Sequence, residues 1–421
     1  METKIKFTVS VDDLKKALKV VSIVSPQAQA SSPDRGYLFV VQGEECRIYS
    51  KNGSQEARSS FPISSVEGEG GFMYPADYIS EFDFRKGSIL FEVLSDDTAW
   101  KVKYTTDTGA GSERVSFDPG TMVSMERKIQ EALSSEPKIF DVALIKDAIG
   151  TTKSFVAGDN DKTAADQHRT IQIFGDTEGP LAKGNGFMLA SNNTRCCYYY
   201  TDAFKGNGLA VPGGEIGLMD KFLSRSSGAL KVYETPKGYY LHNDKGDIVG
   251  WQHTVDTHKK FAYYAKKDQI VVRVDVAAMS DQLRFMRAAI PKDTNKIRIA
   301  FNSAEGTFKF SSVDAGGSST SSDSIKVEEV LRCEVTPEEG GADFQTFVNV
   351  EYMLSLFSGL KGALTEFRVF IVTSQNRPKP AYMFRTIDEY LFNGTVVGGV
   401  LENAEEGTHG CTVTRFTPNI A

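Results

Sequence analysis

Basic side chains recur on the outer faces of amphipathic helical segments in three parts of this sequence. In residues 11–24, for example, Leu14, Leu18 and Val21 have the spacing of a buried helical stripe, and the lysines fall outside it. The chemistry of such exposed cations is contact with phosphate. The candidate phosphate-contacting residues are Lys15, Lys16, Lys19, Lys146, Lys153, Lys221, Arg225, Arg284, Arg287 and Lys361. In any single helix such residues are usually a solvated face, but their recurrence in three copies favours a shared cationic surface.

The sequence lacks the residue spacings that are typical of catalytic and metal sites. Residues 150–154 do not have the spacing of a phosphate-binding loop, and residues 206–208 lack a third glycine. The five histidines show no zinc-binding pattern. Asp159, Asp161 and Asp166 depart from the calcium-loop pattern. The sequence therefore predicts a protein that is not an enzyme, with no catalytic residue, no cofactor and no metal.

The elements that would position the basic residues form a unit that occurs three times. The first helix of each copy is predicted at residues 11–24, 142–156 and 276–290, after strands at residues 6–9, 138–141 and 271–275. The second helix is predicted after Pro75, Pro212 and Asn349, ending near Gly87, Gly228 and Gly362. Two further strands per copy are predicted at residues 89–93 and 100–104, 230–233 and 239–242, and 367–372 and 381–387. The copies are offset by roughly 130–140 residues, which identifies an internal repeat.

This repeat predicts an α+β protein of three domains, with two helices and antiparallel strands in each. The predicted domains are residues 1–136, 137–268 and 269–421. The Ser- and Gly-rich residues 316–322 are predicted to form a long hairpin loop inside the third domain.

The composition excludes several classes of protein. Charged residues make up 24% of the 421 residues and hydrophobic residues 40%, as in soluble globular proteins. No apolar run is long enough to span a membrane, and the N-terminal residues lead into a strand rather than a secretion signal. Five cysteines, two of them adjacent at Cys196 and Cys197, are too few for a disulfide framework. We therefore expect a reducing, cytoplasmic compartment.

The net charge limits how the chain could hold nucleic acid. A protein that binds DNA by neutralising phosphates usually carries a basic excess, whereas this chain has a formal charge of −7. Any role on DNA would need local positive faces, or a hold that requires little affinity.

Several segments resemble the bacterial replicative sliding clamp, the beta subunit of the DNA polymerase III holoenzyme. The resemblance rests on the opening strand at residues 6–9, on Val211 and Pro212 before a helix, on residues 347–357, and on the closing segments 379–387 and 414–420. These segments follow the order of the family along nearly the whole chain. A phage-encoded or otherwise divergent member of the family would fit the departures described below.

The resemblance implies a head-to-tail homodimer that forms a ring of six domains, with two inner helices per domain and antiparallel sheets outside. Such a ring encircles duplex DNA, is placed there by a clamp loader, and tethers a DNA polymerase as a processivity factor. The basic residues would face the DNA and contact phosphates without regard to base sequence. Because topology rather than affinity would hold the DNA, an acidic net charge is compatible with this role. We expect cytoplasmic action, in a bacterial cell or an infected host cell.

The family also binds partner peptides in a pocket between its second and third domains. Arg195 is kept in the matching wall, whereas Asn193, Thr194 and Cys196 replace the glycine, histidine and leucine of the family. The pocket residues implied by the resemblance are Ile171, Ser191, Asn193, Thr194, Arg195, Cys196, Arg415, Phe416, Thr417 and Pro418. The departures leave open whether the family's standard peptide or a dedicated partner binds there.

An alternative from another class stays open at this point. Three similar α+β modules could also build a structural or adhesive protein, such as a virion component. The behaviour of the chain on circular DNA and its mass in solution distinguish the two hypotheses.

Overall fold

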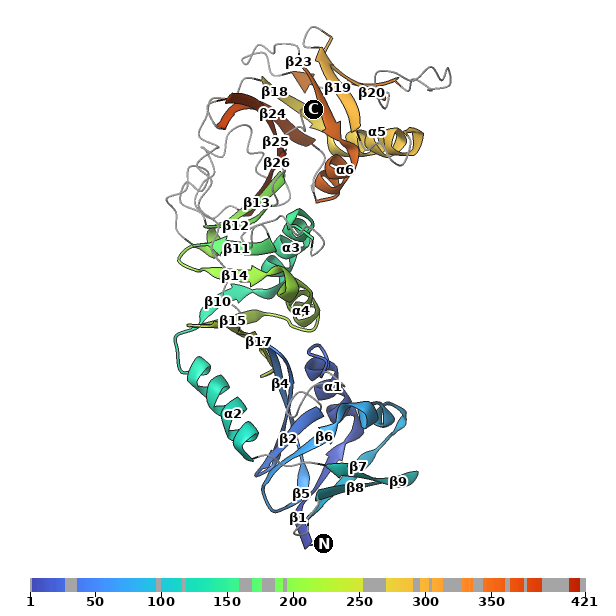
Figure 1. Ribbon diagram of the computed structural model, residues 1–421, viewed down its shortest axis with the longest axis vertical. Coiled ribbons are helices and arrows are strands. Elements are labelled where there is room, and N and C mark those ends of the chain that lie inside the picture. Colours follow the sequence, from blue (N-terminus) through green and yellow to red (C-terminus); the bar gives the residue numbers. More distant parts are fainter. Residues whose placement is uncertain are drawn as a thin grey trace. The chain divides into compact units, whose positions relative to one another are not determined.

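The computed structural model describes residues 2–26, 36–95, 100–115, 119–158, 169–175, 186–191, 195–252, 270–290, 296–302, 305–312, 328–332, 334–335, 344–359, 364–374, 377–387 and 409–416 (Figure 1). The chain divides into two compact units. The first contains residues 1–146 and 214–254, and the second contains residues 147–213 and 255–421. The three predicted domains stay a prediction, since residues of the second repeat belong to both units.

The first unit contains two antiparallel sheets. Its elements are β1 (Glu2–Ser10), α1 (Val11–Val21), β2 (Gly36–Gln42), β3 (Glu45–Asn52), β4 (Gln55–Pro62), β5 (Ser64–Glu67), β6 (Gly70–Pro75), η1 (Ala76–Phe84), β7 (Ser88–Ser95), β8 (Trp100–Thr106), β9 (Gly109–Val115), α2 (Pro119–Leu133), β10 (Lys138–Asp141), α4 (Gly213–Leu223), β15 (Ala229–Thr235), β16 (Gly238–His242) and β17 (Ile248–Trp251). The helix α3 (Val142–Thr152) crosses the boundary between the units. The five-stranded sheet has the order β5-β1-β7-β8-β9, and the eight-stranded sheet has the order β10-β15-β16-β17-β4-β3-β2-β6.

The second unit is also built on antiparallel sheets. Its elements are η2 (Lys153–Phe155), β11 (Thr170–Phe174), β12 (Gly186–Ser191), β13 (Arg195–Thr201), η4 (Asp202–Phe204), β14 (Leu209–Pro212), β18 (Ile270–Asp275), α5 (Val276–Ala289), β19 (Lys296–Asn302), β20 (Thr307–Ser312), β21 (Glu328–Arg332), β22 (Glu334–Val335), β23 (Phe344–Asn349), α6 (Val350–Gly359), β24 (Leu364–Ser374), β25 (Arg377–Ile387) and β26 (His409–Phe416). The nine-stranded sheet has the order β14-β11-β12-β13-β26-β25-β24-β18-β22, and the four-stranded sheet has the order β21-β20-β19-β23.

The repeated helices and strands are confirmed, with three differences. The second helix of the first repeat is a 3-10 helix, η1, that buries only Phe82; a short segment with one buried side chain gains little from a longer α-helix. The helix α2 was not predicted, and it does not belong to the repeated elements. The first helix of the second repeat, α3, ends at Thr152, and the chain continues as the 3-10 helix η2. The predicted hairpin loop at residues 316–322 lies outside the described residues.

The eight-stranded sheet of the first unit is covered on both faces. Strand β2 is buried at six successive positions, which is expected when helices cover both sides of a strand. Helix α1 contacts β3 and β4, and the Ser50 hydroxyl donates to the Val21 carbonyl at 2.6 Å. The neighbouring Tyr49 points to the opposite face and packs near α2. Figure 1 shows α2 on one side of this sheet and α1 and α4 on the other.

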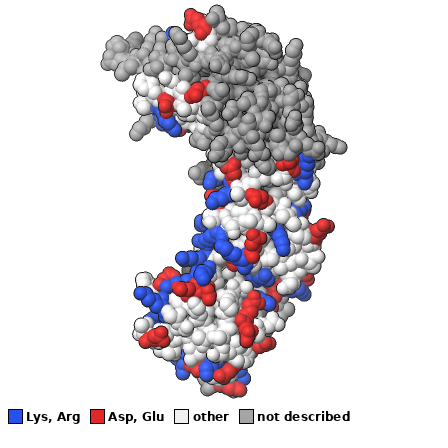
Figure 2. Space-filling view, turned by 180° about the vertical axis from the view of Figure 1, so that it is seen from behind, with Lys and Arg blue, Asp and Glu red and all other residues white. Residues whose placement is uncertain are grey.

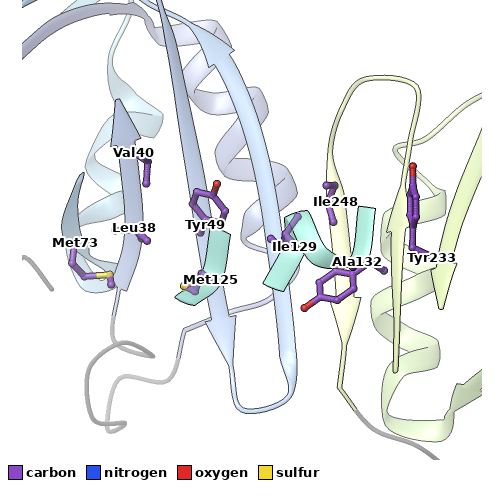
Figure 3. Packing of buried hydrophobic residues seen from close by; sticks show 10 residues of the cluster. Leu38, Val40, Tyr49, Met73, Met125, Ile129, Ala132, Tyr233 and Ile248 are labelled. Carbon is purple, nitrogen blue, oxygen red and sulfur yellow. The ribbon is translucent and has the colours of Figure 1, made fainter. Parts of the chain in front are cut away.

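Helix α2 joins the first repeat to the second through an apolar cluster. Met125, Ile129 and Ala132 have helical spacing and are all buried. The cluster consists of Leu38, Val40, Tyr49, Met73, Met125, Ile129, Ala132, Tyr233, Tyr240 and Ile248. Figure 3 shows the helix running from the strands of the first repeat toward Ile248 and Tyr233 of the second. The two repeats therefore share one core in this unit.

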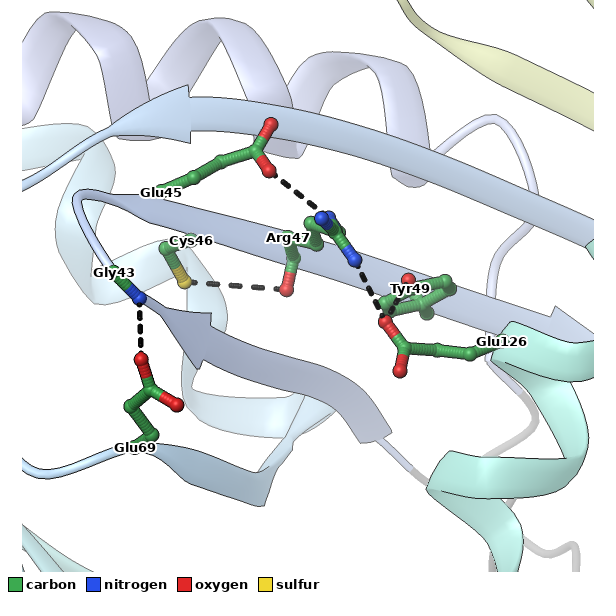
Figure 4. A network of polar contacts seen from close by, with 7 residues as sticks. All are labelled: Gly43, Glu45, Cys46, Arg47, Tyr49, Glu69 and Glu126. Atoms are coloured by element: carbon green, nitrogen blue, oxygen red, sulfur yellow. Dashed lines mark hydrogen bonds and ion pairs between the residues drawn. The ribbon is translucent and has the colours of Figure 1, made fainter. Parts of the chain in front are cut away.

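A polar network fixes the middle of α2 to the sheet (Figure 4). The Glu126 carboxylate accepts hydrogen bonds from Tyr49 Oη at 2.8 Å and from Arg47 Nη1 at 3.1 Å. Burial and the nearby Glu126 carboxylate raise the pKa of Tyr49, so its phenol stays a donor. Two hydrogen bonds to one half-buried carboxylate fix the position of the helix along the sheet and its rotation about its own axis.

The strands β4 and β17 meet where the first repeat joins the second, and buried carboxylates line this join. Glu56 is 2% exposed and accepts from Tyr240 Oη at 2.9 Å. Asp247 is 7% exposed and accepts from Ser59 Oγ at 2.5 Å. Each bond links the two repeats. Removing either hydroxyl would take one donor from a buried carboxylate and leave it with a second, Gln252 Nε2 for Glu56 and Asn243 Nδ2 for Asp247.

Candidate nucleic-acid interface

The lysines of α1 are the first predicted phosphate contacts, and they differ in their surroundings. Lys15 Nζ donates to the carbonyls of Asp83 at 2.7 Å and Arg85 at 3.0 Å, so it ties α1 to the end of η1. Lys16 is exposed and pairs with Asp13 at 3.0 Å, one helical turn earlier. Lys19 is exposed in the last turn, where a cation suits the helix dipole. Lys15 thus has a structural role in addition to its charge.

Helix α4 supplies an exposed pair of cations. Lys221 lies in its last turn, and Arg225 follows just after the helix ends at Leu223, in a turn closed by its amide donating to the Phe222 carbonyl at 3.0 Å. Apolar residues on the same helix, including Met219 and Phe222, are fully buried and fix its orientation on the sheet. Within the described part of the chain, neither cation forms an ion pair with a carboxylate. Their charges are therefore available to an external anion.

A third cation lies beside this pair and was missed by sequence reasoning. Lys245, in the turn between β16 and β17, donates from Nζ to the Arg225 carbonyl at 3.0 Å. We call Lys221, Arg225 and Lys245 the α4 basic cluster. Lys245 has no counterpart in the helical pattern, so only its hydrogen bond to the end of α4 reveals it.

The predicted cations of α3, η2 and α5 are also at the surface, and the two arginines of α5 form ion pairs with carboxylates. Lys146 and Lys153 are exposed. Arg284 pairs with Asp281 at 3.0 Å on the same helix, and both side chains are largely exposed. Arg287 pairs with Glu351 and so links α5 to α6. Lys361 lies outside the described residues.

The space-filling view supports the presence of a local cationic region on the first unit. Figure 2 shows Lys and Arg side chains gathered along the side of this unit that carries α1 and α4, with Asp and Glu side chains among them. A protein with a net charge of −7 thus concentrates part of its positive charge on one side of this unit. Such a concentration is what contact with a polyanion requires.

The predicted pocket residues that are described lie in the nine-stranded sheet of the second unit. Strand β13 pairs with β26 so that Arg195 is opposite Phe416 and Cys196 is opposite Arg415. On the other side of β13, Ser191 of β12 is opposite Cys196. Ile171 lies one strand farther along, in β11, opposite Ala190. The sheet therefore brings together residues that are more than two hundred positions apart in the sequence. Asn193, Thr194, Thr417 and Pro418 lie outside the described residues.

No group of three or more His, Cys, Asp or Glu side chains in the described ranges is arranged to hold a metal ion. None of the helices that are described combines the length and apolar character needed to cross a membrane.

Comparison with solved structures identifies the fold. No protein-family model matches the chain, and no curated protein shows a match to it in sequence. Many solved structures are similar over nearly the whole length, among them the following three. A DNA polymerase sliding clamp from Bacillus subtilis has a TM-score of 0.73 and 12% identity, covering 100% of both chains. A DNA polymerase sliding clamp from Pseudomonas aeruginosa has a TM-score of 0.72 and 13% identity, covering 99% of this chain and 100% of the other.

The third structure supports the same conclusion. The beta subunit of DNA polymerase III from Thermotoga maritima has a TM-score of 0.71 and 12% identity, covering 99% of this chain and 100% of the other. The chain therefore has the fold of the bacterial DNA polymerase III beta sliding clamps, as the sequence resemblance predicted, in a highly divergent sequence.

Proposed function

We propose that this chain is a sliding clamp that encircles duplex DNA and tethers a DNA polymerase as a processivity factor. The observation that carries the proposal is the clamp fold along the entire chain. A ring holds DNA by topology, so its contacts with phosphates can be weak and mobile. This physical feature reconciles a net charge of −7 with a role on DNA. The alternative of a structural or adhesive protein is not favoured, because a fold match over the whole chain leaves no part of it unaccounted for.

The exposed cations support contact with DNA that is independent of base sequence. Lys19, Lys146, Lys221 and Arg225 form no ion pair within the described residues, so their charges can approach a phosphate backbone. Lysine and arginine contacts to phosphates position a duplex without reading its bases. We include Lys15, Lys16, Lys153, Arg284, Arg287 and Lys361 in the proposed DNA-facing set.

Ring closure by two copies, head to tail, is the second part of the proposal. The five-stranded sheet of the first repeat ends in β9, and the four-stranded sheet of the third repeat ends in β21. An edge strand exposes unpaired backbone groups, and pairing with a second copy would satisfy them. Pairing of β9 in one copy with β21 in the other would repeat at both junctions and close the ring.

Light scattering tests this closure. The expected mass at micromolar concentration is twice the chain mass of 46.3 kDa. A single-chain mass under these conditions would contradict a stable dimer, and a much larger assembly would favour the structural alternative.

A partner pocket is the third part of the proposal. Arg195, Phe416 and Pro418 would contact a short peptide from the polymerase or from a clamp loader. The pairing of Arg195 with Phe416 in neighbouring strands supports this, because the two proposed walls then meet in one sheet.

Titration of the C-terminal peptide of the partner polymerase tests the pocket. We expect the affinity of an Arg195→Ala, Pro418→Ala double variant to fall by more than roughly tenfold, as for the loss of central interface residues. An Arg127→Ala variant, altered on the exposed side of α2, is the matched control. Equal affinities for the double variant and the unaltered protein would refute the assignment.

A further inference from the structure

The turn between β16 and β17 is rigidly built around one buried side chain. Asn243 is 4% exposed, and its Oδ1 accepts from the backbone amides of Lys245 and Asp247, both at 3.0 Å. Its Nδ2 donates to Ser226 Oγ and to Asp247 Oδ2, both at 3.2 Å. The two donors and two acceptor positions of this amide are therefore all used. Gly246, with a φ of 85°, completes the tight turn.

This network places the turn against the end of α4. Ser226, which accepts from Asn243, lies just after the helix, and Asp247 is held from the other side by Ser59 of β4. These hydrogen bonds fix the turn to the end of α4 and to β4, and they do not involve the Lys245 side chain. The hydrogen bond from Lys245 Nζ to the Arg225 carbonyl then places a third cation at the C-terminal end of α4.

Within the described residues, the nearby carboxylates form no ion pair with the α4 basic cluster. Asp244 Oδ2 accepts from the Ala229 amide at 3.2 Å, and Asp247 is buried in the Asn243 network. Throughout the described ranges, none of the three cations of the cluster forms an ion pair. A single cation at a helix C-terminus is explained by the helix dipole. Here three exposed cations gather at one helix end, and one of them is carried by a turn whose backbone a buried network holds in place.

We propose that Lys245 is a phosphate-contacting residue for duplex DNA, acting together with Lys221 and Arg225. The inference rests on the proposed clamp function and adds a contact from a strand-connecting turn to those of the helices. Charge complementarity selects the occupant, because a duplex presents a dense row of phosphates to a cluster of fixed cations. Asn243 acts as a positioning residue that holds the turn.

The salt dependence of binding to a short linear duplex of random sequence tests the inference, with fluorescence anisotropy as the readout. Each phosphate contact contributes about 0.9 to the slope of log K against log salt concentration. We expect Lys245→Ala to reduce this slope by about 0.9 and Lys245→Arg to leave it unchanged. Lys237→Ala is the matched control, because Lys237 is an exposed lysine in the turn at the other end of the same β15–β16–β17 meander.

An unchanged slope for Lys245→Ala, or an equal reduction for Lys237→Ala, would overturn the inference. The proposed clamp function has a separate test in retention on closed circular DNA, which depends on topology. A Lys245→Ala protein that is retained on circles but shows the unaltered slope would refute the Lys245 contact alone. Loss of retention by the unaltered protein would refute the clamp function.

Discussion

Substitution of Ile129 by Asp is expected to lower the free energy of unfolding by about 3–5 kcal/mol, the range for losing a large buried side chain, with the buried charge adding to the loss. Ile129 is 1% exposed and lies in the cluster that α2 forms with strands of both repeats. A carboxylate at this position would have no cation or donor in an apolar environment. The helix α2 would therefore detach from the sheet, and the face of the sheet that α2 covers at the join between the first two repeats would become exposed.

Urea titration measures this effect through tryptophan fluorescence. Both tryptophans, Trp100 in β8 and the fully buried Trp251 in β17, belong to the first unit, so their emission reports on its unfolding. Gln130→Asp is the control, since Gln130 is the exposed neighbour of Ile129 in the same helix and a surface change there should shift stability by less than about 0.5 kcal/mol. Equal midpoints for the two variants would show that α2 does not contribute to the core of this unit.

Reversal of charge at both Lys221 and Arg225 is expected to weaken duplex binding more than any other pair of surface changes in the first unit. Removal of two phosphate contacts reduces the salt slope by about 1.8, and two added carboxylates then repel the backbone. Both residues are exposed and have no carboxylate partner in the described part of the chain, so the Lys221→Glu, Arg225→Glu variant should keep its thermal stability.

The control is the Lys231→Glu, Lys237→Glu variant, which has the same change in net charge. Lys231 is directly opposite His242, which is opposite Ile248 of the α2 cluster, so these side chains share the sheet face that α2 covers. The control should therefore bind duplex DNA nearly as the unaltered protein does. If both double variants lost binding equally, the effect would come from net charge and the α4 surface would not be the contact site.

The ion pairs explain why other predicted contacts are less suitable for such tests. Arg287 pairs with Glu351, so Arg287→Glu would place two carboxylates together between α5 and α6. Lys15 holds the carbonyls at the end of η1, so its loss would disturb that segment as well as any contact with DNA. Changes at these two positions would combine structural and electrostatic effects.

The repeated elements could be predicted because each carries its own local signal. The first helices have apolar stripes at helical spacing, and strands such as β7 alternate between buried and partly exposed residues. The helix α2 has such a stripe too, at Met125, Ile129 and Ala132, but it is not one of the repeated elements and was not predicted. The 3-10 form of η1 is associated with the burial of a single side chain, Phe82. The sequence alone does not reveal which of its apolar side chains are buried.

In the candidate site, too, residues within one helix could be predicted from the sequence, whereas contacts between segments distant in the sequence could not. Lys221 and Arg225 could be identified from helical spacing alone. Lys245 could not, because its relation to them depends on the buried Asn243 amide and on a hydrogen bond between residues twenty positions apart. The pairing of Arg195 with Phe416 likewise depends on strand register across the nine-stranded sheet. Only the family resemblance brought those two segments together in advance.

The central claim is that two copies of the chain enclose DNA, and retention on closed circular duplex DNA tests it most directly. The clamp is assembled on the circle with its loader, washed at high salt, and followed before and after a single double-strand cut. A topological hold predicts retention on the closed circle despite the salt, and rapid loss once the cut creates ends. Loss from closed circles and from linear DNA at the same rate would contradict encirclement.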